Sequence, residues 1–405
     1  MEPVTIKRVS SKQELKTFIR FNYEFYKDSP YSVPDLYDDM LGTFSPKKNA
    51  AFEFCEADYF LALKGGKVVG RVAAIINRRA NERWGKKQVR FGWIDFIDDE
   101  NVSRALIDTV IAWGRERGMT EIVGPLGFTD MDAEGMLVEG FDRRSLFFTN
   151  YNAPYYLEHL TRLGYRKDVD WIEYRITVPA PGSAEAERLH KLSEFILKRK
   201  NLHVATVHHK SEYGPFVRQV FELVNAAYAP LYGVVELSDE QIERYANKFI
   251  PLVDPEFVCF VLDEQENLVA FGVTTLDPSP ALKHSDGRLF PFGWAEVLND
   301  LHHVDTLIML LTAVRPDLQT EGINAVMMDH VCQSCNRHGV QFAETGPMLE
   351  LNDHILAQWK RLEKEQHKRR RCFIKDLDHG INAANAAAAA QAEAPEEAPA
   401  AESAE

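Results

Sequence analysis

The chain has 405 residues, of which 45% are apolar, 27% charged and 11% aromatic. This is the composition of a globular protein with two or three domains, and we expect two. The net charge is −14, but the last 25 residues hold five glutamates and no lysine or arginine, so the rest is only mildly acidic. An acidic body repels phosphate backbones, and we therefore expect no nucleic-acid partner.

Five cysteines, an odd number, do not suggest a disulfide framework in a chain of this length. The N-terminal residues contain no apolar secretory segment, and no stretch reaches the ~18 apolar residues of a membrane span. These features predict a cytoplasmic location, with contact at the inner face of the membrane as the one membrane-linked alternative.

The first half predicts a regular series of elements. A capping box of Ser11 and Glu14 precedes a helix with apolar residues at helical spacing. The later elements, in chain order, are a hairpin of strands 59–63 and 68–75, a strand at 91–96, a helix at 103–117, a strand at 121–123 and a helix at 150–160.

The second half repeats this order. Its elements are a helix at 217–228, a hairpin of strands 257–262 and 268–275, a strand at 306–314, a helix at 322–337, a strand at 340–344 and a helix at 352–362. The repeated pattern predicts an α+β fold with mixed central sheets. We expect domains at 1–178 and 186–379, a Pro/Gly linker at 179–185, and a disordered Ala/Glu/Pro tail at 380–405.

Two segments carry a resemblance to a known family. Tyr155–Tyr165 closes the first half and Ala313–Asn324 lies inside the second, and together with the element order they resemble tandem GCN5-related N-acetyltransferases (GNAT). Gly124–Phe128, Gly135–Phe141 and Tyr151–Tyr156 are similar to the bacterial ceramide-synthase-like branch of that superfamily. The resemblance implies two GNAT-like domains.

The resemblance also implies acyl-CoA or acetyl-CoA as co-substrate, held where two parallel strands splay apart, with the pyrophosphate at the following helix N-terminus. The family's loop motif reads Gln319-Thr-Glu-Gly322-Ile-Asn324 here, with Asn324 in place of a small residue. The implied cofactor-binding residues are Ala313, Val314, Arg315, Gln319, Glu321, Gly322, Ile323 and Asn324.

The matching stretch of the first half lacks glycine and holds Asp98, Asp99 and Glu100, which would repel a pyrophosphate. We interpret these carboxylates as a helix-start charge set. The first half is therefore not expected to bind the CoA pyrophosphate, and one half should hold the cofactor while the other supplies part of the acceptor pocket.

The amine must lose a proton as it attacks, so a carboxylate is expected near the gap. Glu344 and Glu350 are candidates for the base, although a solvated or structural role is at least as plausible for each. The family's tyrosine acid is missing from the second half, whereas the first half keeps Tyr156 at the equivalent place. Either the CoA thiolate leaves unassisted or a donor comes from another segment.

The acceptor pocket is expected to draw on a first-half loop. Its carboxylates could hold an ammonium group, and neighbouring aromatic side chains could line an apolar channel, although each residue alone fits a solvated or core role. The candidates are Asp130, Asp132, Glu134, Glu139, Tyr151, Tyr155, Phe147 and Phe148.

Two further patterns were weighed. Cys332-x-x-Cys335 has no second Cys-x-x-Cys pair, so we expect buried thiols and no metal. Basic residues from Lys360 to Arg371 predict a basic final helix, which is either a solvated helix end or a contact for the CoA 3′-phosphate or anionic lipid headgroups.

Together these features predict an acyl-CoA-dependent N-acyltransferase acting on a small-molecule or lipid amine, with a sphingoid base suggested by the resemblance. Two alternatives stay open. A non-catalytic tandem domain would sense a ligand or scaffold a partner, and an aminoacyl-tRNA-dependent transferase would need a concentrated basic surface.

Overall fold

The computed structural model describes residues 2–288 and 304–377. The tail expected at 380–405 lies outside these residues. Within the described part no helix is long and apolar enough to cross a membrane.

The first half contains the expected elements and several short additional ones. Ser11 and Glu14 form the capping box of α1, as the spacing predicts. The elements in chain order are β1 (Val4–Arg8), α1 (Lys12–Phe25), α2 (Tyr37–Thr43), β2 (Cys55–Lys64), β3 (Lys67–Asn77), α3 (Arg78–Trp84), β4 (Gln88–Phe96), α4 (Glu100–Arg115), β5 (Glu121–Gly124), β6 (Met136–Glu139), α5 (Tyr155–Arg162) and β7 (Arg166–Thr177).

The second half repeats the order, with a 17-residue helix added at its start. Its elements are α6 (Ala184–Lys200), β8 (His203–Val204), α7 (Gly214–Tyr228), α8 (Asp239–Phe249), β9 (Val258–Leu262), β10 (Leu268–Leu276), α9 (Ser279–His284), β11 (Thr306–Val314), α11 (Asn324–His338), β12 (Phe342–Thr345), β13 (Met348–Leu349), α12 (Asp353–Ala357) and β14 (Lys364–Asp376).

The strands form one mixed sheet in the order β1-β2-β3-β4-β5-β14-β7-β12-β11-β10-β9-β8, with β6 and β13 beside β14 and β7. Helices cover both faces. In β3 the side chains of Val72 and Ala74 belong to the core beneath α4 and α5, whereas Ala73 and Ile75 face α1 and α2. This alternation follows from the two-residue period of a strand, and it explains why β3 is apolar throughout its second part.

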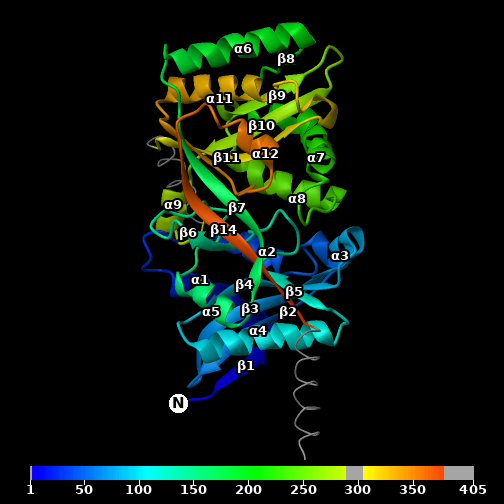
Figure 1. Cartoon of the computed structure of the whole chain (residues 1–405), viewed down its shortest axis with the longest axis vertical. Coiled ribbons are helices and arrows are strands. Elements are labelled where there is room, and N and C mark those ends of the chain that lie inside the picture. The colour runs from blue at the N-terminus through cyan, green and yellow to red at the C-terminus, as the bar shows by residue number, and fades with distance from the viewer. Residues whose placement is uncertain (1, 289–303, 378–405) are drawn as a thin grey trace, which may run out of the picture.

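The last strands of the two halves are exchanged. The repeat would lead β7 to pair with β5 of its own half and β14 with β12, but β14 pairs with β5 and β7 pairs with β12. β7 and β14 also pair with each other over most of their length, and Figure 1 shows them crossing side by side between the two bodies. The mixed sheets expected for two domains are therefore one continuous sheet.

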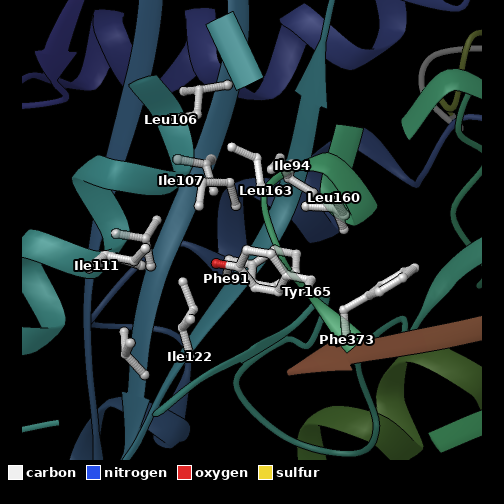
Figure 2. Close-up of a cluster of buried hydrophobic side chains, with 14 of the residues drawn as sticks. Phe91, Ile94, Leu106, Ile107, Ile111, Ile122, Leu160, Leu163, Tyr165 and Phe373 are labelled. Carbon is white, nitrogen blue, oxygen red and sulfur yellow. The ribbon is translucent and has the colours of Figure 1, made fainter. Parts of the chain in front are cut away.

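The exchange extends to the hydrophobic core. Phe373, which lies on β14, belongs to the first-half core cluster that contains Phe91 and Tyr165 (Figure 2). Phe373 is 2% exposed. The C-terminal strand thus adds a buried apolar side chain to the core of the first half, although it belongs to the second half in sequence.

The prediction of a basic final helix at 360–371 is wrong. Residues from Lys364 onwards form β14, and α12 ends at Ala357. Lys368 and Arg370 are 1% and 0% exposed, and both pair with the fully buried Glu173 of β7, at 3.3 Å and 2.6 Å. The alternate cations of this strand point into a buried ion-pair network, so they do not form the exposed basic face that contact with anionic lipid would need.

Candidate functional site

The site begins where β11 and β12 separate. The two strands are parallel and paired from Thr306 opposite Phe342 to Met309 opposite Thr345, where β12 ends at a Gly346-Pro347 turn. β11 continues to Val314 and remains paired on its other side with β10. A cavity of about 430 Å³ opens at this point, and we call it the gap cavity.

Backbone groups of β11 are free to face the gap. The Arg315 N–H donates to the Val269 carbonyl on the β10 side, so it is not available to a ligand. Because hydrogen bonds alternate along an antiparallel ladder, the N–H groups of Val314 and Thr312 are directed away from β10 and towards the gap. A bulge opposite Val273 and Thr274 also leaves Leu310 without a β10 partner, which bends β11 locally.

The N-terminus of α11 lies at one end of the gap cavity. No side chain caps it, so the positive end of its dipole is available to an anion, although the Ala325 and Val326 N–H groups already donate to the Gly322 and Ile323 carbonyls, each at 2.9 Å. Gly322 has a φ of +81°, which favours glycine in the turn into the helix. The carboxylate of Glu321 is turned away to Lys200 at 2.7 Å, and this pairing lowers the pKa of Glu321.

The eight cofactor candidates divide into two groups. Ala313, Val314, Gln319 and Asn324 line the gap cavity. The other four do not line it: Arg315 pairs with Asp317, Glu321 with Lys200, Gly322 forms the turn, and Ile323 is 1% exposed in the core. The residues that do line the cavity, with the open helix end, fit a CoA pyrophosphate and pantetheine arm.

The equivalent gap of the first half is filled by its own side chains. The Phe96 N–H donates to the Tyr156 hydroxyl at 2.9 Å, and the Tyr155 hydroxyl donates to the Phe96 carbonyl at 2.5 Å. Asp99 caps α4 by accepting from the Asn101 N–H, which confirms the expected helix-start role. The backbone groups and helix end that would hold CoA are thus already satisfied.

A first-half loop reaches the second-half gap. The loop is held by the Asn77 amide, which donates to the Phe128 carbonyl at 2.8 Å, and by the Asp132 carboxylate, which accepts from the Phe128 and Thr129 N–H groups. This turn aims Asp130 and Glu134 into the wall of the gap cavity. The two halves therefore build one site.

Five carboxylate side chains are among the residues that line an adjoining cavity of about 180 Å³, which we call the acidic cavity. It shares Asp130 and Glu134 with the gap cavity and is further lined by Asp35, Asp39 and Asp132. Asp39 is paired with Lys248 at 2.6 Å. The other four carboxylates line the acidic cavity without a salt bridge in the part of the chain that the structure describes.

Burial raises the pKa of several of these carboxyl groups. It raises the pKa of Asp130 and that of Asp35 to about 6, and it raises the pKa of Glu134 well above its ordinary value, with neighbouring Asp130 adding to the shift. Within the described residues, Asp130 Oδ1 is buried and has no hydrogen-bond partner. A carboxyl group with a pKa of about 6 can accept a proton near neutral pH.

The three catalytic candidates lie away from the gap cavity lining. Glu344 pairs with Arg175 at 2.9 Å, and Glu350 pairs with Arg369 at 2.9 Å, both within the ion-pair network of the exchanged strands. Tyr156 is fully buried in the closed first-half gap.

The acceptor candidates are also divided. Asp130 lines both cavities and Asp132 the acidic cavity, whereas Glu139 pairs with Arg369 at 3.1 Å. Tyr151 donates to the Phe141 carbonyl at 3.3 Å, and Tyr155 belongs to the first-half gap. Phe148 lines both cavities, and Phe147 is 5% exposed in a core cluster.

Three ionisable residues that line the gap cavity were not anticipated from the sequence. The Tyr228 hydroxyl, on α7, donates to the Thr312 carbonyl at 2.9 Å, and burial raises the pKa of Tyr228 to about 12. The Tyr232 hydroxyl donates to Asp168 at 2.5 Å. His354 lines the gap from α12. The internal repeat alone could have indicated Tyr228, since α7 corresponds to α1.

The cysteines Cys332 and Cys335 are buried free thiols, as expected. Across residues 2–288 and 304–377, no group of three or more His, Cys, Asp or Glu side chains is arranged to hold a metal ion.

Known proteins are similar to this chain over most of its length. Protein YghO of Escherichia coli strain K12 is 28% identical over 377 residues, covering 91% of this chain and 94% of the relative. The bacterial ceramide synthase of Caulobacter vibrioides is 27% identical over 296 residues, covering 72% and 74%. No family model matches.

Solved structures share the fold. A tandem GNAT protein from the clavulanic acid biosynthesis pathway superposes with a TM-score of 0.52 at 13% identity, covering 92% of this chain and 98% of that one. A fungal glucosamine N-acetyltransferase region related to GCN5 gives a TM-score of 0.53 at 13% identity, with 93% and 38% covered. The expected fold and resemblance are confirmed.

Proposed function

Since the chain is a tandem GNAT-fold protein that resembles bacterial ceramide synthase, we propose that it transfers an acyl group from an acyl-CoA thioester to a primary amine. The observation that carries the proposal is the open gap of β11 and β12 with the Asp130 carboxyl group in its wall, whose Oδ1 has no hydrogen-bond partner among the described residues.

The division of labour follows from the lining. Gln319, Asn324 and the uncapped end of α11 would hold the pyrophosphate. The N–H groups of Thr312 and Val314 would donate to the thioester oxygen as negative charge develops on it. These donors are fixed by the ladder with β10, so they need no rearrangement during the reaction.

The amine would enter from the acidic cavity. Its carboxylates attract an ammonium group, and Asp130 would take the proton before nitrogen attacks the carbonyl carbon. Nitrogen gains the acyl group and releases its second proton to solvent, the carbon–sulfur bond breaks, and the electron pair leaves with the CoA thiolate. His354 lies on the helix where the family's proton donor is expected, and it is the candidate that would protonate this thiolate.

The resemblance to ceramide synthase favours a long-chain amine such as a sphingoid base as the acceptor. Met131, Phe148 and Leu310 give the acidic cavity an apolar part beside its carboxylates, which suits an amine on a hydrocarbon chain.

Calorimetric titration with CoA tests the cofactor half of the proposal. Asn324→Asp adds one negative charge at the start of α11 and should weaken CoA binding about tenfold or more, while stabilising the helix by about 0.3–1 kcal/mol. Asn324→Gln keeps the charge and should weaken CoA binding less than Asn324→Asp does. Equal affinity of all three proteins, or no CoA binding by the wild type, would refute the assignment.

A further inference from the structure

A second, apolar cavity lies on the α11 side of the sheet. It measures about 80 Å³ and is enclosed by β11 and β12, α11 and the segment after α12. Its lining includes Met309, Met327, Met328, Val331, Ala343 and Trp359, and within the described residues no charged side chain lines it. We call it the apolar cavity.

The apolar cavity adjoins the gap cavity, because the two share lining residues. Leu311, Thr312, Asn324 and Gln358 line both. The two cavities meet here because β12 ends at Thr345. Beyond Met309, no strand among the described residues pairs with β11 on the side away from β10. An extended group held at Thr312 could therefore pass from the gap to the face of the sheet that α11 covers.

We infer that the apolar cavity receives the acyl chain of the donor thioester, so that donors with chains longer than acetyl bind more tightly than acetyl-CoA. The inference rests on the proposed function. With the carbonyl oxygen at the Thr312 and Val314 N–H groups and the sulfur directed towards α11, the chain must leave along one of two routes. The acidic cavity has carboxylates beside its apolar lining, whereas no charged side chain among the described residues lines the apolar cavity.

The size of the cavity sets the expected length. The cavity of about 80 Å³ is several times the roughly 10–15 Å³ that one water-sized group needs, so it accommodates a short run of methylenes without movement. Three of the lining residues are methionines, whose unbranched side chains adapt readily to a longer guest. Affinity should therefore rise about fourfold for each of the first buried methylenes, the equivalent of about 0.8 kcal/mol each.

The test compares the binding of CoA, acetyl-CoA, hexanoyl-CoA and palmitoyl-CoA by the wild type and two matched variants. Val331→Phe fills the apolar cavity from α11. Val217→Phe makes the same change from α7 into a different apolar cavity of about 70 Å³ on the opposite face of the sheet. Both valines are half-buried helix residues that line a cavity of similar size.

We expect Val331→Phe to lower hexanoyl-CoA affinity at least tenfold with CoA affinity unchanged, and Val217→Phe to leave the chain-length profile of the wild type. A flat profile in the wild type, or a loss caused by Val217→Phe instead, would overturn this inference alone. Failure of the wild type to bind CoA would refute the proposed function itself. Should Val331→Phe not fold, Val331→Ile must shift the profile in the same direction, and an unchanged profile would count against the inference.

Discussion

Asp130 and Asp132 lie two residues apart in one loop, yet their carboxyl groups have different surroundings. Asp130 Oδ1 has no partner within the described residues, whereas Asp132 Oδ2 accepts from the N–H groups of Phe128 and Thr129. One carboxyl group is available for chemistry, and the other maintains the turn that presents it. Substitution should therefore separate a functional role from a structural one.

Asp130→Asn should stabilise the protein above pH 6. The folded-state pKa of Asp130 is raised from 3.8 to about 6, so the unfolded chain loses this proton first, and stability falls as pH rises between those values. The amide variant avoids that loss. Its free energy of unfolding should exceed that of the wild type by about 1–3 kcal/mol at pH 8, and this difference should disappear near pH 4. Urea unfolding at the two pH values measures it.

Asp132→Ala is the contrasting variant. It should destabilise the protein by about 1–3 kcal/mol at pH 8, because two loop N–H groups lose their acceptor. A destabilised Asp130→Asn protein, or an Asp132→Ala protein as stable as the wild type, would contradict this distinction.

At the residue scale, the candidate site residues chosen from the sequence lie partly inside and partly outside the two cavities. Asp130 was anticipated because a cluster of carboxylates follows a turn in the half that lacks a cofactor loop. Glu344 was expected near the chemistry because it lies on the strand that flanks the gap, and Glu350 because it follows the Gly346-Pro347 turn, but they pair with Arg175 and Arg369 from β7 and β14. Their neighbours depend on the strand exchange, which no local pattern reveals.

At the scale of elements, β14 carries the clearest energetic claim. Although burial opposes it, Arg370 and Lys368 lower the pKa of the fully buried Glu173. Among the described residues, Glu173→Gln would leave the buried Arg370 without a charged partner and Lys368 with Glu344 alone, at 3.4 Å, and we expect a loss of about 3–5 kcal/mol in urea unfolding.

The matched control lies on β14, which pairs with the strand β7 that carries Glu173. Glu365 forms an exposed pair with Arg143, and Glu365→Gln should cost less than about 1 kcal/mol. Similar losses for the two variants would show that the buried network does not hold β14 in place.

The helices α1 and α4 were predicted from the sequence because each buries one face, and the hairpin β9–β10 because two continuous apolar runs flank a turn. β14 was not, since Lys368 and Arg370 resemble surface residues unless their buried partner Glu173 is known. α6 was missed because the repeat has no counterpart for it.

At the scale of the whole molecule, the exchange of β7 and β14 makes each half depend on the other. The sequence repeat predicts two copies of one fold, but β7 and β14 are equivalent strands that could complete either sheet. Their choice is decided by contacts such as that of Phe373 with the first-half core. We propose that the boundaries near 179–185 separate repeats and not independently folding domains.

Cleavage of the linker tests this dependence. With a protease site inserted after Gly182, an exposed turn residue, the cut protein should elute as one particle of the intact size, because each fragment contains a strand of the other's sheet. Two separately eluting folded fragments would contradict the exchange.

The central claim is that a cofactor gap in one half works with a carboxyl group from the other. Thiol release from hexanoyl-CoA on adding a long-chain primary amine tests it most directly. Wild-type release should depend on the amine and rise with pH through about 6, whereas Asp130→Asn should lose about 100-fold in rate at unchanged CoA affinity. Binding of CoA without amine-dependent thiol release, or full activity of Asp130→Asn, would contradict the account.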